Sequence, residues 1–196
     1  MNLVDRVQNI LMTPRTEWKK IADETQSVRE LFTGYAMILA AIPAVLGILL
    51  GFVFGRGYSG FDYLLMNAIL NYAIGLAVLY VAGIAAAALA PSFDGQKDQI
   101  AGMKTVIYSC TAIWVATVFL VLPLLGPLIL LAGFVYAAYL LYLGCQETLK
   151  IPENNAIGFT AVIIIGALVI GTVLGSLMSR IAWRMTADSL YNPGIF

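Results

Sequence analysis

The sequence of 196 residues contains no histidine and few charged residues. Histidine is the commonest general acid or base in enzymes and the commonest metal ligand, so its absence argues against both kinds of chemistry. Only 11% of the residues are charged, compared with about a quarter in soluble domains, and 61% are hydrophobic. Eleven basic residues balance eleven acidic ones, so no excess charge favours nucleic acid as a partner. The composition therefore predicts an integral membrane protein.

Catalytic motifs are missing as well. The chain has no glycine-rich phosphate loop, no nucleophile elbow and no pair of carboxylates at a working distance along the sequence. We therefore expect no enzyme, no catalytic residue, no cofactor and no metal. The only cysteines, Cys110 and Cys145, both lie in apolar runs, where we expect them to pack as small hydrophobic side chains.

Five apolar stretches dominate the chain. Each is long enough to cross the roughly 30 Å hydrocarbon core of a bilayer as a helix. None has a charged residue near its middle, where a charge costs about 2.5–3.5 kcal/mol or more. We predict an all-α polytopic membrane protein with a short amphipathic segment over residues 1–27, a compact five-helix bundle over residues 28–179 and a tail over residues 180–196. The predicted spans are residues 28–54, 63–90, 103–122, 124–144 and 157–179.

Local signals set several of these boundaries. Ser27 followed by Glu30 matches a capping box and predicts the start of the first span, and Pro43 predicts a kink within it. Pro91 cannot continue a helical hydrogen-bond ladder, so the second span should end near residue 90. The uncharged stretch around residues 123–127 forms either a tight hairpin between the third and fourth spans or a hairpin that re-enters the membrane.

Lysine and arginine are distributed unevenly between the two ends of the predicted bundle. The end with the N-terminus carries Arg6, Arg15, Lys19, Lys20, Arg29, Lys97, Lys104 and Lys150, whereas the other end carries Arg56, Arg180 and Arg184. Basic residues tend to stay on the cytoplasmic side of a membrane. We therefore predict a multi-pass protein of the cell membrane with its N-terminus in the cytoplasm and its C-terminus outside.

The first 27 residues have the pattern of an interfacial segment. Leu3, Val7, Ile10 and Leu11 share a helical face, and Pro14 is suited to begin a second short helix capped by Thr13. Tryptophan favours the headgroup level and lysine favours anionic lipid. The segment either anchors the first span or binds a protein partner on the cytoplasmic side. The candidate interaction residues are Glu17, Trp18, Lys19 and Lys20, together with Asp94 and Lys97 in the longest polar loop.

Small residues recur every four positions in two of the spans. The glycines concerned are Gly47, Gly51 and Gly55 in the first span and Gly171 and Gly175 in the fifth. Such rows allow helices to approach closely in lipid. They serve either packing within the bundle or a homo-oligomer interface.

The second span has a polar face, formed by Asp62, Tyr63, Asn67 and Asn71. An amide in lipid must find a hydrogen-bond partner because water is absent. These residues either bond to neighbouring helices or line a pore or a substrate cavity. Proton-driven transport is not favoured, because no titratable group lies at mid-depth.

Several stretches resemble the Yip family of Ypt/Rab-interacting membrane proteins, in its short prokaryotic branch. They are RVQNILMTPRTEWKKIADE, TGYAMILAAIP, FDGQKD, VIYS and YAAYLLYLGCQETLKIPENNAIGFT, with TEW and YLLYLG the most specific. The resemblance implies a five-pass bundle with a cytoplasmic N-terminus. The eukaryotic members of the family are associated with prenylated Rab-type GTPases and membrane shaping. Ala112 and Gln146 stand where the family tends to have proline, which predicts straighter helices here.

Two functions follow as expectations. The first is a non-catalytic role in organising the membrane or binding a protein, as in the Yip family. The second is a small channel or a carrier for a lipid or other small molecule, along the face of Asn67 and Asn71. The expected partners are the lipid bilayer, a protein at the cytoplasmic face and a second copy of the chain, with no nucleic acid.

Overall fold

The computed structural model describes residues 2–54 and 61–191. Within these ranges, nothing is described for the side chains of Phe54, Asp62, Tyr63, Met178, Ser179 and residues 181–191. The predicted candidate Gly55 and the side chains of Asp62 and Tyr63 therefore lie outside the described residues. All regular structure in the described ranges is helical, which confirms the predicted all-α fold.

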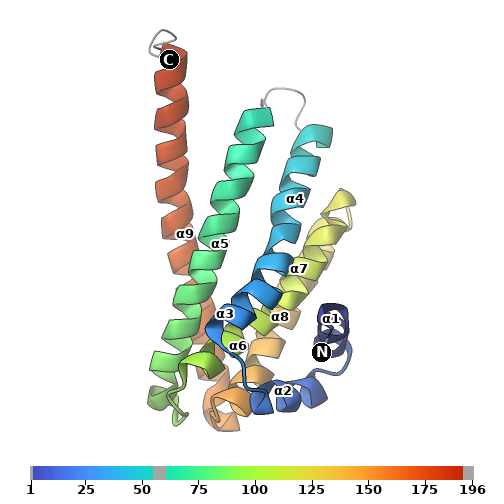
Figure 1. The fold of residues 1–196 in the computed structure, drawn as a ribbon, viewed down its shortest axis with the longest axis vertical. Coiled ribbons are helices and arrows are strands. Elements are labelled where there is room, and N and C mark those ends of the chain that lie inside the picture. The colour runs from blue at the N-terminus through green and yellow to red at the C-terminus, as the bar shows by residue number, and fades with distance from the viewer. Residues whose placement is uncertain (1, 55–60, 192–196) are drawn as a thin grey trace.

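Five helical segments are long and apolar enough to cross a membrane, as predicted (Figure 1). They are Val28–Val53, Leu64–Phe93, Gln99–Val121, Gly126–Thr148 and Glu153–Leu177. The individual elements are α1 (Leu3–Met12), α2 (Pro14–Asp23), α3 (Val28–Leu31), the π-helical η1 (Phe32–Ala36), α4 (Met37–Phe54), α5 (Phe61–Leu89), the 3₁₀-helical η2 (Ala90–Phe93), α6 (Gln99–Ser109), α7 (Thr111–Thr117), the 3₁₀-helical η3 (Val118–Val121), α8 (Gly126–Thr148) and α9 (Glu153–Tyr191).

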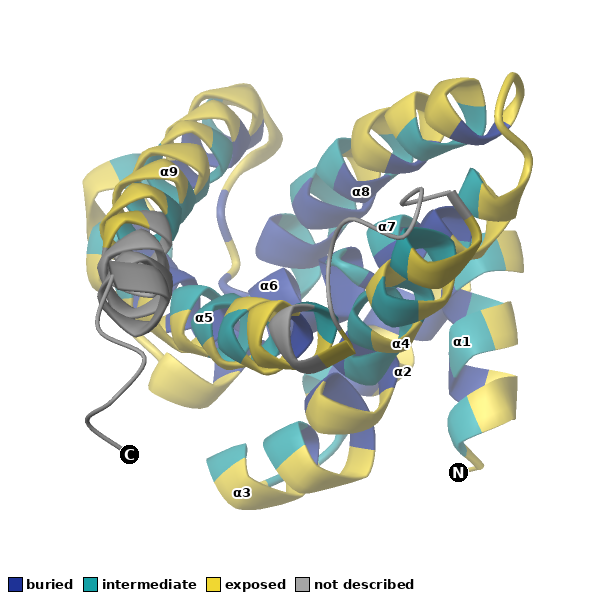
Figure 2. Ribbon diagram, turned by 90° about the horizontal axis from the view of Figure 1, so that it is seen from above, coloured by how far each residue is buried: buried dark blue, intermediate teal, exposed yellow. Residues whose placement is uncertain are grey.

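The bundle is most tightly packed at one end, which we call the base. The base holds α2 and the loops that lead into α6 and α9, whereas the C-terminus lies at the opposite, far end (Figure 1). Helix α6 forms the centre, with every residue from Ala101 to Ser109 buried (Figure 2). In the most apolar 18-residue window of the third span 61% of the residues are buried, compared with 17% in those of the first and the fifth. The first and fifth spans are therefore less enclosed by protein than the third.

Polar caps decide where two of the spans begin. Ser27 and Glu30 form the predicted capping box, with Glu30 Oε2 accepting from the Ser27 amide over 2.9 Å and Ser27 Oγ accepting from the Glu30 amide over 3.2 Å. At the third span, Asp98 Oδ1 accepts from the amides of Ile100 and Ala101. The third span therefore begins at Gln99 rather than residue 103, because an aspartate cap stabilises the earlier start.

Other boundaries also differ from the prediction. The fifth helix begins at Glu153 rather than residue 157 and continues to Tyr191, into the predicted tail. The second span continues past Pro91 as the 3₁₀ turn η2, in which the proline occupies the first turn and its missing amide is not needed. The fourth span runs from Gly126 to Thr148, four residues beyond the predicted end. Between η3 and α8, residues 122–125 form a short turn in which the Gly126 amide donates to the Leu122 carbonyl over 2.8 Å. The structure thus has a tight hairpin here.

Irregular backbone occurs where no proline requires it. The first span contains the π-helical turn η1, whereas α4 continues as one helix through Pro43. The third span is interrupted at Cys110, between α6 and α7. The expectation from Ala112, that this span is straighter than is usual in the family, stays a prediction. Thr111 Oγ1 donates to the Tyr108 carbonyl over 2.7 Å beside this break. A hydroxyl that bonds the backbone in this way competes with the helical ladder and bends it.

The glycines that bring helices together are mostly not the predicted ones. A Cβ atom at Gly102 would lie 2.6 Å from the Gly83 carbonyl oxygen, and one at Gly133 would lie 2.5 Å from the Ala116 Cβ. By contrast, nothing lies within 4 Å of a Cβ position at Gly47, Gly171 or Gly175, so these glycines bring no helices together within the bundle. The alternative, a homo-oligomer interface, stays a prediction. In the predicted rows Gly51 does have a close neighbour, the side chain of Leu64 at 2.6 Å. Spacing alone did not reveal which side of a helix meets a neighbour.

Candidate functional site

A buried ion pair joins the first two helices at the base. Arg6 of α1 is 5% exposed and Glu17 of α2 is fully buried. Arg6 Nη1 donates to Glu17 Oε1 over 2.6 Å, and Nη2 donates to Glu24 Oε1. Burial lowers the pKa of Arg6, but the hydrogen bond to Glu24 and the neighbouring charges outweigh this and raise it above its ordinary value. The guanidinium therefore stays charged and holds α1 against α2.

A second buried cation fastens α2 to the third span. Lys104 of α6 is 4% exposed, and its Nζ donates to the carbonyl oxygens of Ile21, over 2.8 Å, and Glu24. These carbonyls lie at the C-terminal end of α2, where the helix dipole favours a positive charge. Lys104 is thus a clamp on α2, whereas the sequence suggested a charge at the membrane boundary.

The indole of Trp18 packs against α8 at a glycine. The side chain is fully buried, and a Cβ atom at Gly144 would lie 2.7 Å from two of its ring carbons. The ring also meets Tyr108 edge-on, with centroids 6.3 Å apart. The segments TEW and YLLYLG, which carry the family resemblance most specifically, therefore contact each other through Trp18 and Gly144.

The expectation that Glu17 and Trp18 contact a cytoplasmic partner is wrong, because both side chains are buried in the base. Sequence reasoning also missed Arg6 and Lys104. A signal for Arg6 was present, since it lies four residues before Ile10 on the apolar face of α1. A charge on that face indicates an oppositely charged partner in the interior.

The other candidate interaction residues are exposed. Lys19 and Lys20 point outward from α2, and Lys20 Nζ reaches Glu17 Oε2 over 3.2 Å. Asp94, in the left-handed region at φ 60°, accepts from Asn155 Nδ2 over 2.7 Å. The amide of Gln96 donates to the Leu149 carbonyl over 2.7 Å, which holds the loop against the end of α8. We call the exposed set of Lys19, Lys20, Asp94 and Lys97 the basal surface.

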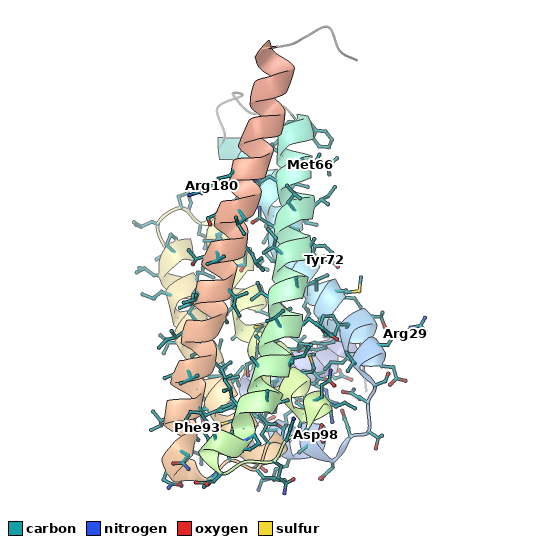
Figure 3. All side chains as sticks on the ribbon, turned by 90° about the vertical axis from the view of Figure 1, so that its left-hand side faces the viewer. Arg29, Met66, Tyr72, Phe93, Asp98 and Arg180 are labelled. Carbon is teal, nitrogen blue, oxygen red and sulfur yellow. The ribbon has the colours of Figure 1, made fainter. Side chains whose placement is uncertain are left out.

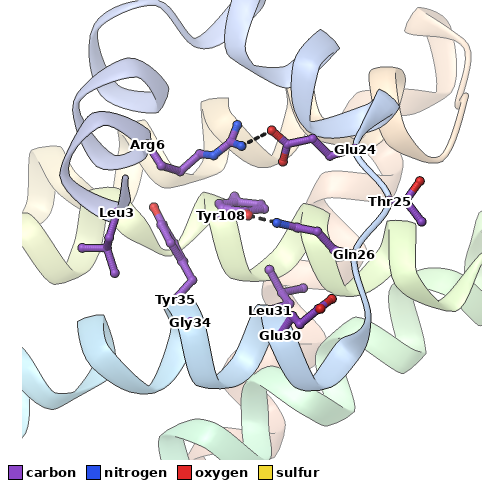
Figure 4. Close-up of a pocket in the computed structure, with 10 residues that line it drawn as sticks. All are labelled: Leu3, Arg6, Glu24, Thr25, Gln26, Glu30, Leu31, Gly34, Tyr35 and Tyr108. Carbon is purple, nitrogen blue, oxygen red and sulfur yellow. Dashed lines mark hydrogen bonds and ion pairs between the residues drawn. The ribbon is translucent and has the colours of Figure 1, made fainter. Parts of the chain in front are cut away.

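A polar pocket of about 440 Å³ lies beside the ion pair of Arg6 and Glu24, which form part of its lining (Figure 4). Two of its lining residues, Tyr108 and Gln26, are bonded to each other, with Tyr108 Oη donating to Gln26 Oε1 over 3.2 Å. A third, Tyr35, shares a hydrogen bond of 2.7 Å with Thr111, which does not line the pocket. Among the described lining residues Arg6 is the one cation, and two carboxylates already neutralise it. The pocket therefore does not have the charge of an anion site.

A larger cavity of about 800 Å³ lies between α4, α5, α7, α8 and α9. Asn67 and Asn71 are on its wall, and Asn71 Nδ2 donates to the Asn67 carbonyl over 2.8 Å and to Asn67 Oδ1 over 2.6 Å. The structure thus places these two predicted residues together on a cavity, with their bonds inside one helix. The described residues of the wall include no charged side chain.

Metal and thiol chemistry have no evident site in the part of the chain that the structure describes. No group of three or more histidine, cysteine, aspartate or glutamate side chains is placed there to hold a metal ion. Cys110 and Cys145 are free thiols, one half-buried and one buried. Cys145 Sγ donates to the Tyr142 carbonyl over 3.2 Å, so it is part of the packing of α8.

Comparison with known proteins gives one family. The sequence model described as the Yip1 domain matches residues 9–175. The chain is 26% identical over 191 residues to the inner membrane protein YohC of Escherichia coli strain K12, covering 92% of this chain and 96% of the relative. A protein of the same name from Escherichia coli O6:H1, strain CFT073, gives the same values. No solved structure matches significantly.

Proposed function

The chain belongs to the Yip1 domain family of membrane proteins, and on that premise we propose that it is a non-catalytic membrane-organising protein that binds a protein partner at its basal surface. The rigid seating of α2 supports this. Trp18, Glu17 and the Lys104 clamp hold the helix, so the neighbouring lysines are presented in a fixed position. A preformed surface binds a partner with less loss of conformational freedom than a mobile arm does.

We also propose that the basal surface faces the cytoplasm. The reason is the unequal distribution of basic residues: the predicted topology puts eight on the side of the N-terminus and three on the opposite side. The name of the similar Escherichia coli protein places that protein in the inner membrane. A cytoplasmic basal surface would be accessible to soluble proteins as well as to other membrane proteins.

Site-specific photo-cross-linking in intact cells tests the proposal. A photoreactive residue in place of Lys19 or Lys97 should give adducts with one and the same protein, identified by mass spectrometry. Leu128 on α8 is 63% exposed and is the matched control, because it lies on a membrane-spanning segment away from the base. The charge reversal Lys97→Glu should then reduce the adduct formed from position 19.

Two outcomes would contradict the proposal. One is the same set of adducts at position 128 as at positions 19 and 97. The other is no protein adduct at either basal position while the protein is present at its normal level.

A channel or carrier along the Asn67 and Asn71 face has less support. The two amides bond to each other, and the described wall around them is uncharged and largely apolar. An ion crossing such a wall would lose hydration without gaining a fixed partner. If the protein is a carrier, liposomes that contain it should take up solute, and Asn71→Leu should reduce this uptake. Solute uptake no greater than that of empty liposomes would exclude a carrier for the solutes tried.

A further inference from the structure

The cavity along α5 carries two amides toward the far end of the bundle and apolar side chains deeper in. Asn67 and Asn71 lie about one and two turns after Leu64, where the second span begins, and the neighbouring Met66 is near the far end (Figure 3). Leu79 and Cys110 line the wall deeper toward the base. This order matches that of a membrane leaflet, in which esters lie at the surface and hydrocarbon lies below.

The cavity is also long enough for a lipid chain. Between Asn67 and Leu79, both on the wall, the helix rises about 18 Å, at 1.5 Å per residue. One leaflet of a 30 Å hydrocarbon core is about 15 Å thick. A volume of about 800 Å³ lies within the range of pockets that hold small molecules, about 300–1,000 Å³.

The surroundings determine what fills this space. Phe134 on the wall is 47% exposed, and both asparagines are exposed, so the cavity is open to the outside of the protein. At the depth of the spans the outside is lipid. Apolar cavities exclude water, and the described wall lacks the charges that would hold an ionic ligand.

We propose that this cavity binds one acyl chain of a phospholipid, with the ester end of the lipid at Asn67 and Asn71. Asn67 Oδ1 accepts a hydrogen bond from Asn71, so the Asn67 side-chain NH₂ is the donor available to an ester carbonyl. The acyl chain then runs along α5 toward Trp114 and Leu79. This proposal concerns a lipid within the membrane and is independent of a protein partner at the basal surface.

Glycines on the wall make the cavity fillable by mutation. Gly75 on α5 and Gly171 on α9 both line it, and nothing lies within 4 Å of a Cβ position at either residue. A Cβ atom at either position therefore meets open space, and a leucine side chain there would extend into the cavity. Gly166 is the matched control, because it is equally open and also on α9 but is not among the described residues of the wall.

Trp114 supplies the reporter, since it lines the cavity but is only 7% exposed. The full-length protein is placed in vesicles of phosphatidylethanolamine and phosphatidylglycerol, in which a fraction of the lipid carries dibrominated acyl chains that quench indole fluorescence on contact. The Trp114 signal is the difference between the wild type and Trp114→Phe. We expect quenching of Trp114 in the wild type, at least a twofold reduction in Gly75→Leu and Gly171→Leu, and no change in Gly166→Leu.

The outcomes are decisive in either direction. An unquenched Trp114 in the wild type overturns the proposal, and so does equal quenching in all folded variants. Circular dichroism identifies any variant that fails to fold, and the two fillers come from different helices, so either can decide the result. The competing occupant is a second copy of the protein, which size-exclusion chromatography detects as a dimer. If the wild type is a dimer with unquenched Trp114 and Gly171→Leu dissociates it, the cavity belongs to the second copy and the proposal is overturned.

Discussion

At the scale of single residues, the base is unusual because it buries charges in a protein with few of them. Arg6, Glu17 and Lys104 are each at most 5% exposed, and each has a partner of opposite charge or a carbonyl oxygen within hydrogen-bond distance. A buried charge without a partner is costly, so these contacts must form together. Their common effect is to fix α1 and α2 against the third span.

Replacing one member of the ion pair should therefore destabilise the fold strongly. Arg6→Met leaves Glu17 buried without its main partner, and we expect a loss of about 3–5 kcal/mol. The double variant Arg6→Met/Glu17→Met should lose less than Arg6→Met alone, because it buries no orphan charge. Thermal unfolding in detergent measures both. Lys19→Met, at an exposed position, should stay within about 0.5 kcal/mol of the wild type, and an equal loss in all three variants would contradict this account.

The contact between Trp18 and Gly144 gives a second residue-level prediction. Gly144→Ala places a methyl group against a rigid buried ring, and overpacking of this kind costs about 1–3 kcal/mol. Gly166→Ala adds the same methyl group into open space and should be neutral or stabilising, by up to about 1 kcal/mol through helix propensity. Chemical unfolding of the two variants compares them. A Gly144→Ala protein as stable as Gly166→Ala would show that the indole is not seated as described.

At the scale of elements, two irregular segments meet inside the bundle. The π-helical turn η1 carries Tyr35, and the break between α6 and α7 carries Thr111. Their hydroxyl groups share a hydrogen bond of 2.7 Å, although the residues are 76 positions apart. A hydrogen bond therefore links the two irregular segments. Single-turn π segments often occur at such special sites.

Tyr35→Phe tests this link. The change removes a buried hydrogen bond and should cost about 0.5–1.5 kcal/mol without altering helix content. Tyr80→Phe is the matched control, because Tyr80 lies on α5 and is 43% exposed. Thermal unfolding followed by circular dichroism measures both variants, and an effect of Tyr35→Phe no larger than that of Tyr80→Phe would contradict the prediction.

Run length and composition were sufficient to predict the five spans, and Ser27 with Glu30 fixed the first start. These signals are local, so a single sequence contains them. The burial of Trp18 depends on Gly144, 126 positions away, and the break at Cys110 depends on hydroxyl groups whose bonds are not visible in the sequence. The Asn67 and Asn71 face was recognised as polar, but the cavity beside it arises from the separation of five helices, which no local pattern encodes.

At the scale of the whole molecule, the bundle has two unlike ends. The base joins α1, α2, α6 and α8 through buried contacts, while the cavity lies between the spans toward the far end. Charged exposed residues collect at the base, and apolar exposed residues such as Leu128 and Leu168 cover the spans. This polarity defines an orientation in the membrane, although the direction remains a prediction from the basic residues.

Reporter fusions test that orientation. Alkaline phosphatase, which is active only outside the cytoplasm, should be active when fused after Phe196 and inactive when fused after Lys97. Green fluorescent protein at the same two points should give the reverse pattern. A phosphatase that is active after Lys97 and inactive after Phe196 would show that the true topology is the reverse of the predicted one.

The seating of Trp18 on Gly144 also has a consequence for biosynthesis. The N-terminal helices leave the ribosome first, but their seat is built from the third and fourth spans, which are made much later. Until those spans have entered the bilayer, Arg6, Glu17 and the indole have no final position. These early helices therefore reach their final position only after the third and fourth spans are in place.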